Sequence, residues 1–185
     1  MAPLLQVRDL TIRFRTDEGL IAPVQGVSFD LAEGRTLGLV GESGSGKSVS
    51  SKALMQLLPG SASIDPAARM HYRNRAGQVV KIEALGRSGR AIRALRGGEI
   101  GMIFQEPMAS FSPVYTIGNQ MIETIRLHKG LSARAARELA VEMLTKVGLS
   151  NPGARVDQYA HELSGGMRQR AMIALVLAAG PRLLI

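Results

Sequence analysis

The stretch of this sequence with the clearest chemistry is GESGSGKS, residues 41–48, which fits the pattern G-x-x-x-x-G-K-[ST]. Gly44 and Gly46 let the backbone wrap closely around an anion, so that successive N–H groups can point inward. Lys47 would bring a positive charge to the β- and γ-phosphates of a nucleotide, and Ser48 a hydroxyl to Mg²⁺. We therefore expect a nucleotide phosphate site formed by Gly41, Ser43, Gly44, Ser45, Gly46, Lys47 and Ser48.

A second candidate anion site lies in HELSGGMRQRAMIAL, residues 161–175. Ser164 is a suitable N-cap for a helix that carries Arg168 and Arg170 in its first turns, and Gly165 and Gly166 permit close approach to the backbone. An ordinary capped helix after a flexible turn would have the same pattern. Together with the first loop, it would provide two phosphate-binding ends for one nucleotide.

The elements that must position these residues alternate between strands and helices. Residues 4–14 and 24–31 have the pattern of strands, the first an edge strand, and 36–40 is a short apolar run typical of a buried parallel strand. The loop then leads into a helix over 48–60. Segment 61–98 is weakly patterned, with one strand expected around 78–85.

The second half of the sequence is mostly helical. A strand is expected over 99–105, helical character begins at 116, and the pattern predicts a helix over 132–148 with Ser132 as N-cap and Gly148 just beyond its end. Residues 183–185 read as the start of another strand. The sequence therefore predicts an α/β protein with a helical insertion over about 106–163.

Composition excludes some classes of protein and leaves others open. The 185 residues include no cysteine, so disulfides and cysteine metal sites are excluded within them, and no apolar run is long enough to span a membrane as a helix. The net charge is +8, and the positive charge is concentrated in residues 69–96, where Glu83 is the single acidic residue. This stretch is either a solvated basic surface or a contact for nucleic acid, anionic lipid or phosphate ligands, and it offers only Tyr72 as an aromatic residue.

Three motifs taken together resemble one family. LSGGMRQR is similar to the signature motif of ATP-binding cassette (ABC) ATPases, GESGSGKS to their Walker A loop, and MIFQEP to their Q-loop, in the order and spacing of that family. The surrounding residues resemble the subgroup that powers oligopeptide, dipeptide and nickel importers. The resemblance implies a P-loop NTPase fold with an N-terminal antiparallel β subdomain. It divides the chain into a nucleotide-binding core with that subdomain (1–105), a helical subdomain (106–163) and a signature helix with the start of a core strand (164–185).

The resemblance also implies roles for single residues, with ATP and Mg²⁺ as cofactors. Phe14 corresponds to the aromatic residue that stacks on adenine. Gln105 corresponds to the Q-loop glutamine, which reaches Mg²⁺ and the attacking water, so that Ser48 and Gln105 are the expected metal contacts. Ser164, Gly165 and Gly166 correspond to signature residues that contact the γ-phosphate held by the opposite ATPase subunit.

The function implied is that of the ATP-hydrolysing subunit of an ABC importer for peptides or similar small solutes. The expected partners are a second ATPase subunit, identical or paralogous, two transmembrane permease subunits and, indirectly, a solute-binding protein, with no nucleic acid. The expected location is peripheral, on the cytoplasmic face of the inner membrane.

The last residues, PRLLI at 181–185, correspond to the start of the Walker B strand of the family. In the family this strand leads to an Asp for Mg²⁺ and a Glu that polarises the attacking water, and both would follow Ile185. We therefore expect this stretch to lack the C-terminal part of the core and, by itself, to hydrolyse little ATP. Two alternatives remain open: a remnant that binds nucleotide without turnover, and a soluble ABC ATPase that acts on nucleic acid.

Overall fold

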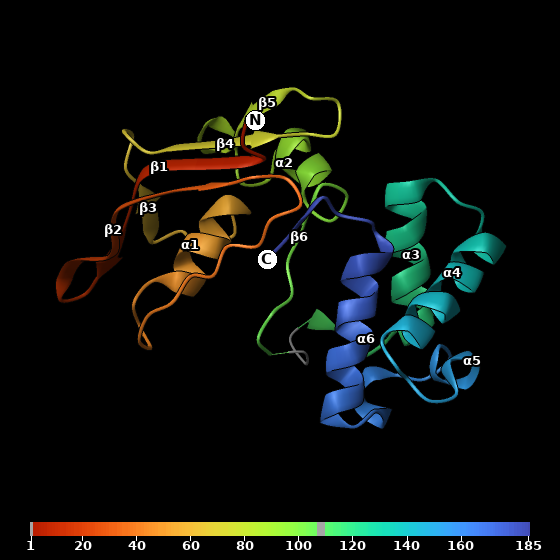
Figure 1. Ribbon diagram of the computed structural model, residues 1–185. Helices are drawn as coiled ribbons and strands as arrows, with labels where there is room; N and C mark the ends of the chain where they lie inside the picture. The colour runs from red at the N-terminus through yellow and green to blue at the C-terminus, as the bar shows by residue number, and fades with distance from the viewer. Residues whose placement is uncertain (1, 107–109) are drawn as a thin grey trace. The chain divides into compact units, whose positions relative to one another are not determined.

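The computed structural model describes residues 2–106 and 110–185 and divides into two compact units, one ending at Leu95 and one spanning Arg96–Ile185 (Figure 1). Each unit has its own secondary structure and its own buried residues. This division reflects how compactly each part of the chain is packed, and it does not test functional boundaries. The predicted functional boundaries at 105/106 and 163/164 therefore stay predictions.

The first unit is built on a five-stranded antiparallel sheet with the order β2-β1-β4-β5 and with β3 paired to β1. Its strands are β1 (Leu5–Thr16), β2 (Gly19–Leu31), β3 (Ala62–Ile64), β4 (Arg69–Arg73) and β5 (Val79–Lys81). The connection after β5 contains η1 (Ile82–Ala84) and α2 (Arg90–Leu95). The expected N-terminal β segments are therefore present, and segment 61–98 supplies the other strands of the same sheet.

The prediction that residues 4–14 form an edge strand is wrong, because β1 lies between β2 and β4 (Figure 1). The alternation of β1 is broken at Asp9, which has a left-handed φ of 51° and a shift in register beside it. Such a bulge adds one residue to the strand, so that Val7 and Leu10 are both buried. The imperfect pattern thus comes from a bulge in a central strand.

The predicted strand over 36–40 is also absent. Residues 36–40 have no regular structure, and Leu37, Leu39 and Val40 are 42%, 43% and 98% exposed. A strand forms only where a neighbouring strand pairs with its N–H and C=O groups. No strand of the described part of the chain pairs with this run.

The helix after the glycine-rich loop, α1 (Lys47–Leu54), is shorter than the predicted 48–60. It ends in a Schellman motif: Gln56 has a left-handed φ of 52°, and the Leu57 N–H donates to the Lys52 carbonyl at 2.9 Å. The Gln56 side chain is buried, and its Nε2 donates to the Ile82 carbonyl at 3.0 Å. This contact with η1 holds the end of α1 against the segment that follows the sheet.

The second unit is mainly helical. Its elements are β6 (Ile100–Gly101), α3 (Ile117–Lys129), α4 (Ala133–Lys146), α5 (Pro152–Arg155), η3 (Ala160–Glu162), α6 (Gly165–Ala178) and β7 (Leu183–Leu184). The two strands pair in parallel, which confirms strand structure within the predicted 99–105 and 183–185 segments. No helix in the described ranges is long and apolar enough to cross a membrane.

The ends of the long helices follow the sequence closely. Thr116, Ser132 and Ser164 each accept a hydrogen bond from the backbone N–H three residues later, as N-caps do. Gly148, just beyond α4, has the left-handed φ of 73° that favours glycine after a helix. The predicted N-cap of α4 and its predicted end are thus confirmed.

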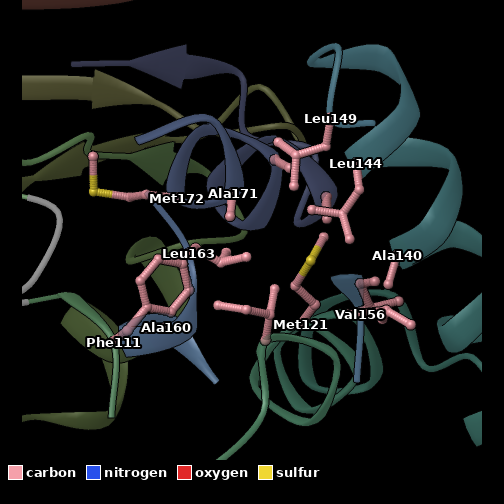
Figure 2. Close-up of a cluster of buried hydrophobic side chains, with 14 of the residues drawn as sticks. Phe111, Met121, Ala140, Leu144, Leu149, Val156, Ala160, Leu163, Ala171 and Met172 are labelled. Carbon is pink, nitrogen blue, oxygen red and sulfur yellow. The ribbon is translucent and has the colours of Figure 1, made fainter. Parts of the chain in front are cut away.

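A cluster of buried apolar side chains joins α3, α4 and α6, and Figure 2 shows its members. Met121 from α3, Leu144 from α4 and Met172 from α6 are each at most 1% exposed. Ala136 and Ala140 let the helices approach closely. Because buried side chains of α6 belong to this cluster, its packing holds in place the helix that begins at the candidate anion site.

Replacement of Leu144 by Ala should remove apolar contacts from this cluster and leave a cavity. We expect Leu144→Ala to lower the free energy of unfolding by about 2–5 kcal/mol. Leu127→Ala, at a side chain that is 76% exposed on α3, should change it by less than about 0.5 kcal/mol. Urea unfolding followed by circular dichroism measures both, and equal effects would contradict the assignment of this core.

Candidate nucleotide-binding site

Two glycines of the loop 41–48 have a backbone conformation that other residues adopt only with strain. Gly44 and Gly46 have left-handed φ values of 83° and 86°, and Gly46 is the N-cap of α1. A Cβ atom on Gly46 would lie 2.5 Å from the Pro23 carbonyl oxygen, and one on Gly41 would lie 2.6 Å from Ser45 Oγ. The backbone of the loop therefore packs directly against β2 at Gly46 and against the Ser45 side chain at Gly41.

Lys47 curls back over the loop. Its Nζ donates to the carbonyl oxygens of Gly41 and Glu42, both at 2.6 Å, and to Ser45 Oγ at 3.1 Å. These contacts hold an ammonium group beside the N-terminus of α1, where the partial positive charge of the helix also attracts anions. The loop thus holds a cation beside the backbone N–H groups at the start of α1.

The loop is open to a ligand. Ser43, Gly44, Ser45 and Ser48 are exposed, whereas Gly46 is buried against β2. The backbone cradle and the ammonium group fit a chain of phosphates. The Ser48 hydroxyl, in the first turn of α1, is a suitable oxygen donor for the Mg²⁺ ion that accompanies such a chain. The described residues contain no cluster of three or more His, Cys, Asp or Glu side chains that could hold a metal ion.

Phe14 lies in the same unit as the loop. It is half-buried on β1, opposite Ile21 on β2 and Ala62 on β3. The β2 residue Val24, whose Cγ2 would lie 2.7 Å from a Cβ on Gly46, is the cross-strand partner of Ile12. The sheet therefore links the loop to the strand segment that carries Phe14.

The second candidate anion site is an exposed helix N-terminus in the second unit. Ser164 caps α6, and its Oγ accepts from the Met167 N–H at 3.4 Å. Gly165 and Gly166 begin the helix, are exposed, and have no described atom within 4 Å of an added Cβ. Glycine costs roughly 1 kcal/mol relative to alanine in a helix interior. No packing within the described chain explains this pair of glycines, which leaves room for an external group at the backbone.

Gln105 is exposed and follows the β6 segment, where the Ile103 N–H donates to the Ile185 carbonyl at 2.8 Å. It belongs to the second unit with Ser164, whereas the loop and Phe14 belong to the first. Of the segment after Gln105, predicted to contact a permease, residues 107–109 lie outside the described residues. The roles of all these side chains stay predictions.

Supporting residues were missed in the sequence. Pro23 and Val24 form the wall behind Gly46, and Arg87 donates to the carbonyls of Pro59 at 2.9 Å and Ala62 at 2.7 Å, beyond the end of α1. The sequence hardly distinguishes these residues, because a Pro-Val pair in a strand and an Arg in a basic segment are both common. Only the folded structure shows that they hold the loop and its helix.

Comparison with known proteins agrees with the geometry. The family described as ABC transporter matches residues 24–185. A putative peptide import ATP-binding protein of Brucella melitensis is 48% identical over 183 residues, which are 99% of this chain and 54% of that protein. The oligopeptide transport ATP-binding protein of Bacillus subtilis is 44% identical over 182 residues, 98% of this chain and 49% of that protein. The chain thus spans about half the length of the curated relatives it matches.

Solved structures agree on the fold. A dimeric, post-hydrolysis ATP-binding cassette bound to ADP and phosphate superposes with a TM-score of 0.82 at 23% identity, over 97% of this chain and 72% of that one. This likeness confirms the predicted α/β cassette fold, with its antiparallel sheet and helical part. Since the family match also covers the loop and the signature helix, the chain belongs to the ABC transporter family.

Proposed function

We propose that this chain is the nucleotide-binding part of an ABC importer ATPase, and that the whole protein couples hydrolysis of ATP to uptake of peptides or similar small solutes. The observation that carries the proposal is the loop at 41–48, where glycines in the left-handed conformation and Lys47 form a phosphate cradle. The importer class is supported by relatives whose names describe peptide import and oligopeptide transport.

The first unit binds the nucleotide in this proposal. The backbone N–H groups of Gly44, Gly46, Lys47 and Ser48 and the ammonium group of Lys47 contact the phosphates, and Phe14 stacks on the adenine ring. Ser48 contributes its hydroxyl to Mg²⁺. When bound, Mg²⁺ offsets the negative charge that the γ-phosphate carries during transfer to water.

The second unit acts on the nucleotide of another ATPase subunit. Ser164, Gly165 and Gly166 would bring an uncrowded helix N-terminus to its γ-phosphate, which accounts for glycines that this chain itself does not need. Gln105, as the resemblance implies, would reach Mg²⁺ and the attacking water. Water then forms a bond to the γ-phosphorus while the bond from that phosphorus to ADP breaks.

The partners in this proposal are a second ATPase subunit, the same or a paralogue, and two permease subunits, with a solute-binding protein acting through the permease. The protein would lie peripherally on the cytoplasmic face of the inner membrane. The names of the relatives and the dimeric cassette structures support this arrangement.

The test is ATP hydrolysis and peptide uptake by the full-length protein, reconstituted with its permease in vesicles. Lys47→Ala should lower hydrolysis by about a hundredfold or more and abolish uptake, because the phosphates lose their fixed cation. Lys52→Ala removes an exposed lysine from the same helix and should stay within about twofold of the parent. Equal activity of the Lys47 and Lys52 variants would exclude this site.

Gly166→Ala should separate stability from activity. Because an added Cβ meets no described atom and alanine favours helix, thermal stability should be unchanged or slightly higher. ATP affinity of the single subunit should also be retained, while hydrolysis falls by about tenfold or more, because the methyl group blocks the partner's phosphate. Full hydrolysis by this variant would show that nothing approaches the start of α6.

A further inference from the structure

One face of the sheet in the first unit carries charges that the nucleotide site does not use. On β4, Met70 and Tyr72 are fully buried, so Arg69, His71 and Arg73 project from the opposite face, as alternation in a strand requires. This second face is at least partly open to solvent along β4.

The register extends this face over the neighbouring strands. His71 lies opposite Gln6 on β1 and Lys81 on β5, and Arg69 lies opposite Arg8. Directly paired residues share a face of the sheet. We call this surface the basic face, defined by Arg8, Arg69, Arg73 and Lys81, together with Gln6 and His71.

The two acidic residues at the basic face are already engaged. Asp30 accepts from Arg8 at 2.6 Å. Glu83 accepts from the Met70 N–H at 2.9 Å and lies 3.4 Å from His71 Nε2. Lys81 is exposed and has no ion-pair partner among residues 2–106 and 110–185. The four cations of the basic face outnumber Asp30, Glu83 and the neighbouring Asp9, so the basic face carries a net positive charge.

Two cations of the basic face lie directly opposite each other, and each has a partner within the chain. Arg8 and Arg69 are like charges directly opposite each other, which destabilises a strand pair. Arg69 is held by the carbonyls of Pro66 at 2.7 Å and Ala68 at 2.8 Å, so its guanidinium is anchored near the strand end.

The chemistry of the basic face favours phosphate groups over bases. Single-stranded nucleic acid is bound by stacking on aromatic rings, and the one aromatic residue of β4, Tyr72, is fully buried on the other side. The residue opposite Arg73 is Val79, an apolar side chain that is 52% exposed. Basic clusters interspersed with apolar side chains suit the headgroup region of anionic bilayers.

We propose that the basic face binds the anionic phosphate headgroups of a phospholipid bilayer. The contact is electrostatic and involves Lys81 and Arg73 near the edge strand β5, with Val79 between the headgroups. It goes beyond nucleotide binding and does not depend on it, since none of these residues lies in the loop 41–48.

The experiment is cosedimentation of the full-length protein with vesicles of phosphatidylcholine containing phosphatidylglycerol, and with vesicles of phosphatidylcholine alone. Binding should require phosphatidylglycerol and weaken as salt is raised. Lys81→Gln should lower vesicle affinity roughly fivefold, the effect of one cation at an anionic surface, and Lys81→Arg should retain it. ATP hydrolysis should be unchanged in both variants.

Lys146→Gln is the matched control, because it removes the same charge from an exposed lysine on α4. Its vesicle affinity should stay within about twofold of the parent. If Lys81→Gln and Lys146→Gln lost vesicle affinity equally, the loss would come from the net charge of the protein and not from the basic face, and the proposal would be overturned. So would a lack of binding to phosphatidylglycerol vesicles, or tighter binding to polyuridylate RNA than to those vesicles, which would indicate a nucleic-acid surface.

Discussion

The close fit of Gly46 against β2 is the constraint on which the candidate site depends. Gly46 ends the loop with a left-handed backbone and begins α1, while the Pro23 carbonyl leaves no space for a side chain. The sheet therefore fixes where the loop turns and where the helix starts. With these points set, Lys47 can reach back to the Gly41 and Glu42 carbonyls and hold its charge over the cradle. Sheet, loop and helix thus act as one support for a phosphate chain.

The second unit also presents a helix N-terminus with glycines, but there the glycines leave the backbone uncrowded. Ser164 caps α6, and the buried cluster around Met121 and Leu144 holds the helix in place. Its first residues, Gly165 and Gly166, are left without neighbours in the described chain. A rigid helix with an uncrowded N-terminus suits a partner's phosphate, in contrast to Gly46 of the loop, which packs against the Pro23 carbonyl. The two glycine-rich segments are therefore glycine-rich for opposite reasons.

Local chemistry was predictable from the sequence, and long-range pairing was not. Motif spacing located the loop, and side-chain oxygens followed by helical pattern located the N-caps, including Ser132. The end of α1 was missed because Gln56 occupies a left-handed position that glycine usually marks. The place of β1 was missed because a bulge at Asp9 looks like poor alternation. The apolar run at 36–40 formed no strand, because burial and pairing depend on a neighbour that local pattern does not show.

The central claim is that the loop 41–48 recognises the phosphates of a nucleotide. Calorimetric titration of the full-length protein with ATP, ADP and adenosine, in the presence of Mg²⁺, tests it most directly. If the cradle and Lys47 provide the main contacts, ATP and ADP should bind and adenosine should bind roughly a hundredfold more weakly or not at all. Adenosine binding as tight as that of ATP would contradict the account, because recognition would then lie in the base and the glycine loop would serve another purpose.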